Sequence, residues 1–466
     1  MPTSDLLDAA QGPLHPAAKE TLIAAIDAGW ADPRRLYAEA RQARRLLDQA
    51  REIIAAGVGV RPEELTFHGS GADALATGLS GLLHARRRRG RVLVASAVEH
   101  SVVLTAGRAR AAQDVTDSLI EVPVEHDGQV DLVAWTGAVG ADGVGVAALQ
   151  HANGEVGTLQ PLPEAYAAAR RAGVPLLCDA QASLGRVDPP QSADVVVGAA
   201  TSFAGPPAVG LLVVREGTRF ALPGRRREAE HGRADSDPWV PLVLATAEAW
   251  RQVEAARESE ARDAYDLIGR LRTELAAIDG LEVVGHPERR LPHVLTASAL
   301  YVDGETVVHE LARRGFLVAS GSACTASTLE PSHVLAAMGA LSHGNIRITL
   351  PLAAVSPDRS QAGAGLPAAL AEIVSDARKG IWGTAQRRPA VGDPAAEDPV
   401  VDARGTLCPQ PVIEVARWWR RHPGSDGVRL LADDAAARVD VPAWCRMTGR
   451  ELRSVRELPD GVTAYE

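Results

Sequence analysis

Two cysteines stand in settings where a thiol could react. Cys324 lies within the small-residue stretch 320–327, directly after the apolar run 315–319. An accessible thiolate is the form of cysteine that attacks sulfur or carbon. For this stretch alone, a buried cysteine in an ordinary turn is an equal alternative. Cys408, followed by Pro409 far along the chain, shifts the balance toward thiol chemistry, whereas Cys445 is expected to be a packed residue.

Composition excludes several classes of protein. The 466 residues carry a formal net charge of -10, which argues against general affinity for nucleic acid. No apolar run approaches the roughly 18 residues of a membrane helix, and the first residues lack the pattern of a signal peptide. We therefore expect no membrane association and a cytoplasmic protein. The four cysteines form no CxxC pair, so we expect neither a disulfide framework nor a metal site.

Short apolar runs alternate with alanine-rich helical stretches. This alternation predicts a mostly parallel sheet that is covered on both faces, an α/β fold. The expected strands are 91–96, 143–150, 174–178, 194–198 and 209–214. The expected helices between them include 71–83, 101–113 and 162–172.

The remaining segments indicate how the chain is divided. Asp32-Pro33 predicts a helix start, and Gly57 predicts the end of that helix. A long helix at about 238–278 leads into a smaller α+β part at about 281–383. Residues 384–399 lack apolar periodicity and are expected to be a linker, so 400–466 would form a separate small domain.

Polar side chains follow three of the predicted strands, and a glycine-rich turn precedes the helix at Gly71. His100, Asn153 and Asp179 follow strands 91–96, 143–150 and 174–178, and ligands of open α/β sheets bind beyond such strand ends. The turn before Gly71 would offer backbone N–H groups to a phosphate. Each group alone is better explained as a cap or a satisfied core residue, but together they favour a site that holds a flat aromatic cofactor.

These residues resemble the cysteine desulfurases of the class V aminotransferase family, which have the pyridoxal phosphate-dependent fold type I. The resemblance covers residues 1–383 and includes Glu99-His100-Ser101, Asn153-Gly154-Glu155-Val156-Gly157, Cys178-Asp179-Ala180, Gly205-Pro206, the stretch from Ser320 to Thr325, Leu329-Glu330-Pro331 and Ile346-Arg347-Ile348.

The resemblance implies a role for each matching residue. His100 would stack on the pyridine ring of pyridoxal 5'-phosphate, Asp179 would pair with its nitrogen, and Asn153 would lie near its oxygen and the substrate. Arg347 would bind the carboxylate of L-cysteine, and Cys324 would accept sulfur as a persulfide. A homodimer is implied as well. The further cofactor contacts would come from Gly71, Ala72, Gln181 and Ser202.

Residues 400–466 resemble the TusA-like sulfur carriers, which form a two-layer α/β domain. The resemblance includes Asp402-Ala403-Arg404-Gly405, Leu407-Cys408-Pro409-Gln410-Pro411, Ala432-Asp433-Asp434 and Asp440-Val441-Pro442-Ala443-Trp444-Cys445. Cys408 would stand at the start of a helix, where the dipole is expected to lower the pKa of the thiol. The fusion suggests a sulfur relay from Cys324 to Cys408 and onward to sulfur-acceptor proteins.

The cofactor lysine of the family has no counterpart in this chain. Ser202 stands in its register upstream of Gly205-Pro206, and Lys19 and Lys379 are the only lysines. Arginine cannot form an imine, because its guanidinium stays protonated. Alanines stand where the family has further polar cofactor contacts, at positions 72, 182 and 199.

Three functions stay open on this basis. The chain could be a working enzyme that holds its cofactor without a covalent bond. It could be a degenerate scaffold that passes persulfide between Cys324 and Cys408. It could also be a subunit that completes the site of an active cysteine desulfurase.

Overall fold

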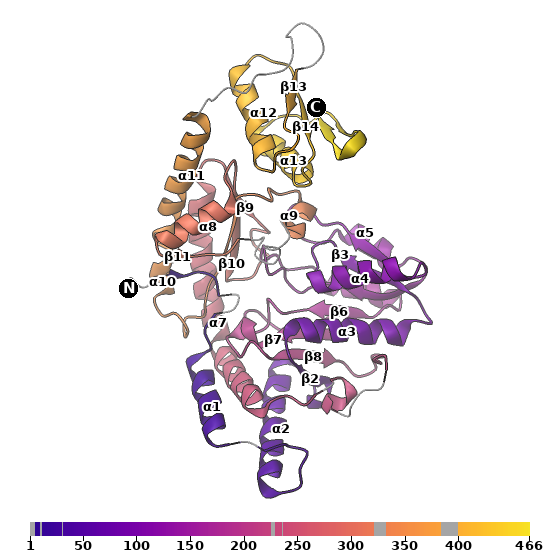
Figure 1. Ribbon diagram of the computed structural model, residues 1–466. Helices are drawn as coiled ribbons and strands as arrows, with labels where there is room; N and C mark the ends of the chain where they lie inside the picture. The colour runs from indigo at the N-terminus through magenta and orange to yellow at the C-terminus, as the bar shows by residue number, and fades with distance from the viewer. Residues whose placement is uncertain are drawn as a thin grey trace.

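The computed structural model describes residues 5–9, 12–29, 31–224, 229–234, 236–320, 332–383 and 399–466. These residues form a large sheet domain, a smaller α+β part beside it, and a C-terminal domain at the top of the view in Figure 1. Cys324 and most of the expected linker, 384–398, lie outside the described residues.

The large domain is built on a seven-stranded sheet in the order β2-β8-β7-β6-β5-β3-β4. Its strands are β2 (Leu65–His68), β3 (Val92–Ser96), β4 (Ser118–Val122), β5 (Val144–Ala148), β6 (Leu176–Asp179), β7 (Val195–Ala199) and β8 (Gly210–Val214). The five strands from β7 to β4 pair in parallel, while β8 is antiparallel to both of its neighbours. The predicted mostly parallel sheet is confirmed.

Helices cover both faces of this sheet, as Figure 1 shows. Successive residues of β7 belong to different apolar clusters, because Val195 and Val197 pack on one face and Val196 on the other. A strand with both faces buried therefore appears in the sequence as a continuous apolar run. The helices are α1 (Pro16–Asp27), α2 (Ala38–Val58), α3 (Gly71–Arg86), α4 (Ser101–Gln113), α5 (Leu132–Val139), α6 (Leu162–Arg171) and α7 (Val240–Ala276).

Both predicted ends of the second helix are wrong. Helix α2 begins at Ala38, because the Asp32 carboxylate accepts the Arg34 N–H at 3.0 Å and closes a separate turn before the helix. The helix also continues through Gly57 and ends at Gly59, whose φ of 77° is one that glycine adopts readily. Gly57 has a different role: a Cβ there would stand 2.0 Å from Nε1 of Trp250, so this glycine allows α7 to approach closely.

Helix α7 joins the large domain to the smaller part. Its first half packs Val243 and Trp250 into the core of the large domain, and its second half packs Ile268 and Leu271 into the core of the smaller part. The strands of the smaller part are β1 (Asp5–Leu6), β9 (Leu281–Val284), β10 (Val294–Ala299), β11 (Phe316–Leu317) and β12 (Asn345–Thr349); its helices are α8 (Gly304–Arg313), α9 (His333–Met338), α10 (Arg359–Ala362) and α11 (Leu366–Gly383). Strand β10 lies between β12 and β9 and is antiparallel to both.

The C-terminal domain has two layers, a four-stranded sheet and two helices. Its strands pair in the order β13-β14-β16-β15. They are β13 (Val400–Asp402), β14 (Arg429–Ala432), β15 (Val455–Glu457) and β16 (Thr463–Tyr465), with helices α12 (Gln410–Arg421) and α13 (Ala437–Thr448). This confirms the two-layer α/β fold expected at the end of the chain.

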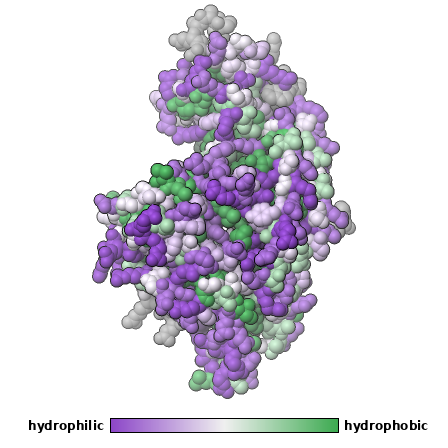
Figure 2. Space-filling model, turned by 180° about the vertical axis from the view of Figure 1, so that it is seen from behind, coloured by the Kyte–Doolittle hydropathy of each residue, from purple (hydrophilic) through white to green (hydrophobic). Residues whose placement is uncertain are grey.

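The surface visible in Figure 2 is mostly hydrophilic, with hydrophobic residues in small separate groups. Among the described helices, none combines the length and the apolar character that crossing a lipid bilayer requires.

Candidate functional site

The predicted polar residues meet at the carboxyl ends of the parallel strands, as expected. His100 caps α4 directly after β3, Asp179 is the last residue of β6, and Asn153 follows β5. His100 and Asp179 are close enough for the charge of the imidazole to lower the pKa of the carboxyl group. The Asn153 amide donates to the Val98 carbonyl at 3.1 Å, which ties it to the segment just before His100. We refer to this group, with Gln181 and Ser202, as the strand-end site.

Asp179 is held by donors from its own loop. Its carboxylate accepts the Gln181 backbone N–H at 2.8 Å and the Gln181 side-chain amide at 3.1 Å. Asp179 is 7% exposed, and this burial raises the pKa of its carboxyl group above the ordinary value, against the charge of His100. Both carboxylate oxygens therefore have an internal partner.

Gln181 also lies against the first turn of α3. Its Oε1 is 2.0 Å from the point where a Cβ on Gly71 would stand, and the Ala199 Cβ is 2.8 Å from the same point. Gly71 is thus needed for this close approach. Gln181 connects Asp179 with the beginning of the helix where a phosphate was predicted to bind, and Ala72 follows in the same turn.

Side chains at the start of α3 already accept some of the backbone N–H groups there. The Ser70 hydroxyl accepts the Asp73 N–H at 3.0 Å, and the Asp73 carboxylate accepts the Gly69 N–H at 3.2 Å. Asp73 also places a negative charge beside the positive end of the helix. Both features weaken this turn as an anion site.

Glu99 is a buried carboxyl group beside Asp179 at the strand ends. It is 1% exposed, and its oxygens accept backbone N–H groups from His100 at 3.2 Å and from Gln150. Burial, followed by the charge of Asp179, raises the pKa of Glu99 to about 8. Glu99 is part of the motif Glu99-His100-Ser101. The sequence gives no signal, however, that its carboxyl group is almost fully buried.

Ser202 lies in the short 3-10 helix Ala200–Phe203 that follows β7. Its hydroxyl donates to the Ala199 carbonyl at 2.8 Å, and its own carbonyl accepts from Arg186 Nε at 2.6 Å. Both lysines lie on other elements: Lys19 is exposed on α1, and Lys379 on α11 pairs with Asp376 at 3.0 Å. An amine at this site is therefore not available from either residue.

Arg347 is hydrogen-bonded to a residue just before the segment that carries Cys324. Its backbone N–H donates to the Ala319 carbonyl at 2.7 Å. Ala319 directly precedes Ser320, the last described residue before the Cys324 segment. Arg347 Nε is buried and has no hydrogen-bond partner among the described residues. A guanidinium can bind a carboxylate, and carboxylate binding by Arg347 stays a prediction.

Glu155 lies beside Ser332, the residue at which the described chain resumes after the Cys324 segment. Burial raises the pKa of Glu155 to about 7, against a hydrogen bond from Ser332 and the charge of Arg347. Ser332 is the first described residue after the gap and caps α9 by accepting the Leu335 N–H at 3.2 Å. The two described ends of the Cys324 segment thus lie near Arg347 and Glu155.

Cys408 lies two residues before α12 and is partly buried. Its N–H donates to Asp434 Oδ2 at 2.8 Å. Burial, then the charges of Asp440 and Asp434, raise the pKa of the Cys408 thiol. The predicted lowering of this pKa by the helix end is therefore wrong, because two nearby carboxylates and burial outweigh the dipole.

The surroundings of Cys408 include residues from outside the C-terminal domain. Asp440, on α13, is 1% exposed; its Oδ1 accepts the Ser342 N–H at 2.8 Å and the Ser342 hydroxyl at 3.0 Å, and its Oδ2 pairs with His343 Nδ1. Burial lowers the pKa of His343, but the hydrogen bond and charge of Asp440, with Asp434 and Asp303, raise it by more. We call His343, Cys408, Asp434 and Asp440 the interdomain cluster.

Apolar and polar contacts hold the two parts together around this cluster. Leu300 and Leu341 of the smaller part belong to the same apolar cluster as Val441 of the C-terminal domain. The Trp444 indole donates to the Tyr301 hydroxyl at 2.6 Å. The C-terminal domain is therefore docked on the smaller part, with Cys408 at the contact.

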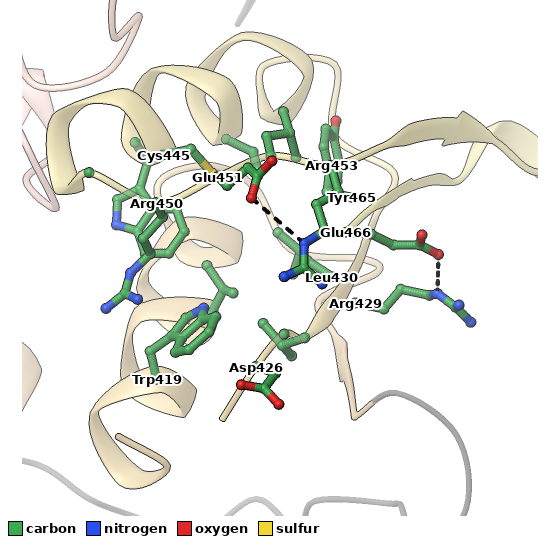
Figure 3. Close-up of a pocket in the computed structure, with 17 residues that line it drawn as sticks. Trp419, Asp426, Arg429, Leu430, Cys445, Arg450, Glu451, Arg453, Tyr465 and Glu466 are labelled. Carbon is green, nitrogen blue, oxygen red and sulfur yellow. Dashed lines mark hydrogen bonds and ion pairs between the residues drawn. The ribbon is translucent and has the colours of Figure 1, made fainter. Parts of the chain in front are cut away.

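The other two described cysteines are buried. Cys178 lies in β6, and burial raises the pKa of its thiol well above the ordinary value. Cys445 lines a hollow of about 260 Å³ together with Trp419, Arg450 and Tyr465 (Figure 3). Cys445 is 7% exposed, and burial raises the pKa of its thiol, which agrees with the expectation of a packed residue.

Comparison with known proteins identifies similar sequences for both parts of the chain. Residues 26–357 match the family described as aminotransferase class-V, and residues 400–465 match the family described as sulfurtransferase TusA. The cysteine desulfurase of Rhodobacter capsulatus is 31% identical over 336 residues, which cover 70% of this chain and 86% of that protein. An IscS-like cysteine desulfurase of Mycobacterium tuberculosis is 31% identical over 390 residues, 78% of this chain and 95% of that protein.

Solved structures share the fold. A NifS-like protein has a TM-score of 0.71 at 22% identity, and the match covers 80% of this chain and all of that one. The apo structure of a cysteine desulfurase from Thermococcus onnurineus has a TM-score of 0.68 at 19% identity and covers 80% of this chain and 95% of that one.

Proposed function

Because the chain belongs to the cysteine desulfurase family of class V aminotransferases and ends in a TusA domain, we propose that it mobilises sulfur through two thiols. Cys324 carries sulfur as a persulfide, and Cys408 receives it. The family depends on pyridoxal phosphate, which supplies the electron sink for breaking the carbon–sulfur bond of cysteine. The residue types of the strand-end site support contacts to the pyridine ring but not a covalent bond to the cofactor.

Two observations speak against a covalently held cofactor. Ser202 carries a hydroxyl that bonds to the Ala199 carbonyl, and neither lysine lies on an element of the site. We infer that Cys324 takes its sulfur from an active cysteine desulfurase or from a small persulfide, and that the chain mobilises this sulfur further by passing it to Cys408.

The proposed transfer is a thiol–persulfide exchange. As Cys408 gives up its proton, its sulfur attacks the terminal sulfur of the Cys324 persulfide. The bond between the two sulfurs of that persulfide breaks, and Cys324 leaves and takes up a proton. One persulfide and one thiol are consumed and one of each is formed, so no oxidant or reductant is needed.

The docking of Cys408 beside residues 342–343 is the observation that carries this proposal. Helix α9 begins at the end of the Cys324 segment and has six residues, a length of about 9 Å. Four residues after the end of α9, Ser342 donates its N–H to Asp440. One short helix and its following turn thus separate the end of the Cys324 segment from the Cys408 site. Tethering of the two domains adds an effective concentration in the millimolar range.

The test is persulfide mapping by mass spectrometry on the full chain. We expect an added sulfur on Cys408 after incubation with L-cysteine and an active cysteine desulfurase, and loss of that label in Cys324→Ser. Cys445→Ser is the matched control and should label normally. Equal labelling of Cys408 with and without Cys324 would refute the relay and favour direct loading by the partner enzyme.

A catalytically degenerate scaffold that completes the site of an active desulfurase is the second candidate. Arg347 favours it, because its Nε has no hydrogen-bond partner among the described residues and its guanidinium could bind a substrate carboxylate. A homodimer and a cytoplasmic location belong to the same proposal, as do sulfur-acceptor proteins downstream of Cys408. This candidate requires that adding the chain increases sulfide release by the active enzyme from L-cysteine.

A further inference from the structure

The interdomain cluster brings three kinds of metal ligand together. A ring nitrogen of His343, Cys408 Sγ and a carboxylate oxygen of Asp440 all lie within 4.8 Å of one another. We propose that these residues form a binding site for a divalent cation that prefers thiolate and imidazole, such as Zn²⁺, with Asp434 as the fourth ligand.

The ligand set determines which cation fits. Zinc takes four ligands from cysteine, histidine and carboxylate side chains in a tetrahedral arrangement. Asp434 contacts both the N–H and the thiol of Cys408, but it lies outside the group of three whose ligand atoms are within 4.8 Å of one another, so its carboxylate would have to move toward His343 and Asp440 to become the fourth ligand. Magnesium and calcium prefer oxygen ligands only, and the thiol and imidazole disfavour them.

The residues around the cluster orient its ligands. The N–H and the hydroxyl of Ser342 both donate to Asp440 Oδ1, which leaves Oδ2 directed at His343. Such outer hydrogen bonds fix a carboxylate for metal binding. Asp440 is 1% exposed, so its orientation is also fixed by packing, while the side chain of His343 is 21% exposed and leaves a path from solvent.

A thiol must lose its proton to bind a metal ion. When the cation binds, the thiol proton of Cys408 leaves for the solvent, and His343 coordinates through a ring nitrogen that carries no proton.

A cation at this site would link two parts of the chain, because its ligands come from both. His343 belongs to the smaller part, whereas the other three residues belong to the C-terminal domain. A bound cation would hold the two parts together and occupy Cys408. In the context of the proposed relay, it would block the acceptor thiol, and this consequence alone rests on the proposed function.

Cobalt is the probe for the site itself. We expect one Co²⁺ per full-length chain, with the thiolate-to-metal charge-transfer absorption and strong visible bands of a tetrahedral site, and displacement by Zn²⁺. Cys408→Ser should abolish the charge-transfer absorption. His343→Ala should weaken cobalt binding by at least about tenfold, since it removes one of four ligands.

Three matched controls make the assignment specific. Cys445→Ser and Cys324→Ser each remove another thiol, and His309→Ala removes an exposed imidazole on α8; all three should bind cobalt as the unaltered chain does. Circular dichroism of each variant checks its folding. A charge-transfer absorption that survives Cys408→Ser, or an unchanged affinity in a folded His343→Ala, would overturn the proposal, as would the absence of cobalt binding to the unaltered chain.

Persulfide mapping separates the metal site from the relay. If both hold, Zn²⁺ lowers the labelling of Cys408 in the unaltered chain, and a chelator restores it. Cobalt binding without any Cys408 labelling, with or without chelator, would refute the relay and leave the metal site standing. Labelling that saturating Zn²⁺ does not affect would show that the cation does not occupy Cys408 and would refute the site.

Discussion

At the strand-end site, Asp179 is surrounded by donors from its own loop, whereas Asp440 in the interdomain cluster shares its space with a second carboxylate and a thiol. Gln181 serves both oxygens of Asp179 and lies only two residues away. The partners of Asp440 are Ser342 and His343, which lie 98 and 97 residues away in another part of the chain.

This difference shows where reactive groups remain available. A buried carboxylate with nearby donors is satisfied locally and stabilises the fold around it. A buried carboxylate that depends on a docked domain can change its partners when the domains separate or a cation enters. The chemistry of this chain is accordingly expected at its thiols rather than at the ends of its parallel strands.

The largest expected effect is an all-or-none change at the strand-end site. Ser202→Lys places a nucleophilic amine in the 3-10 helix that lies beside Ala199 and the first turn of α3. We expect a borohydride-reducible adduct of pyridoxal phosphate on residue 202 of this variant and none on the unaltered chain, because only an amine can form the imine. Absorbance and peptide mass spectrometry measure the adduct.

Ser202→Arg is the matched control for this experiment. It adds a positive charge of similar length without a nucleophile, so it should give no reducible adduct. A reducible adduct on any residue of the unaltered chain would contradict the proposal that this site lacks covalent cofactor chemistry.

The next effect concerns the pH dependence of stability. Burial and the charge of Asp179 raise the pKa of Glu99 to about 8, whereas an unfolded chain has the ordinary value of 4.5. The folded state therefore holds this proton more tightly, and its stability falls as the pH rises from about 4.5 to about 8. Glu99→Gln removes this ionisation and should remove a contribution on the order of a few kcal/mol from the decline.

Denaturant unfolding at pH 5 and pH 8 measures this difference. Glu121→Gln is the control, because Glu121 pairs with Arg108 at the surface and its loss should leave the slope nearly unchanged. The same decline in Glu99→Gln as in the unaltered chain would show that Glu99 does not control it.

Much of the fold could be predicted because the large sheet is buried on both faces. Strands such as β7 then appear as apolar runs, and their alternation with helices indicates a parallel sheet. The antiparallel direction of β8 could not be predicted, because an apolar run is the same in either direction. The helix start expected at Asp32-Pro33 was wrong because Asp32 is satisfied by Arg34 in a separate turn.

The two sites differed in how far they could be predicted. The placement of His100, Asn153 and Asp179 could be predicted because the carboxyl ends of parallel strands meet at one edge, while their roles stay predictions. The interdomain cluster was not found, since its ligands lie at positions 343, 408, 434 and 440 and show no metal-type spacing. Only the docking of the C-terminal domain brings His343 to Cys408, and that contact has no local signal in the sequence.

The smallest predicted effect tests this docking contact directly. Trp444→Phe keeps an aromatic ring in the apolar contact but removes the indole N–H that donates to the Tyr301 hydroxyl at 2.6 Å. One such hydrogen bond contributes about 1 kcal/mol, so undocking should become about fivefold more frequent. Hydrogen exchange of the Ser342 amide measures undocking, because this amide donates across the contact to Asp440.

Trp418→Phe, on α12, removes an indole that stacks on His422 within the same domain and should leave the exchange of Ser342 unchanged. If both variants accelerate that exchange equally, the Trp444–Tyr301 bond does not hold the domains together, and the interdomain cluster must depend on its own charges.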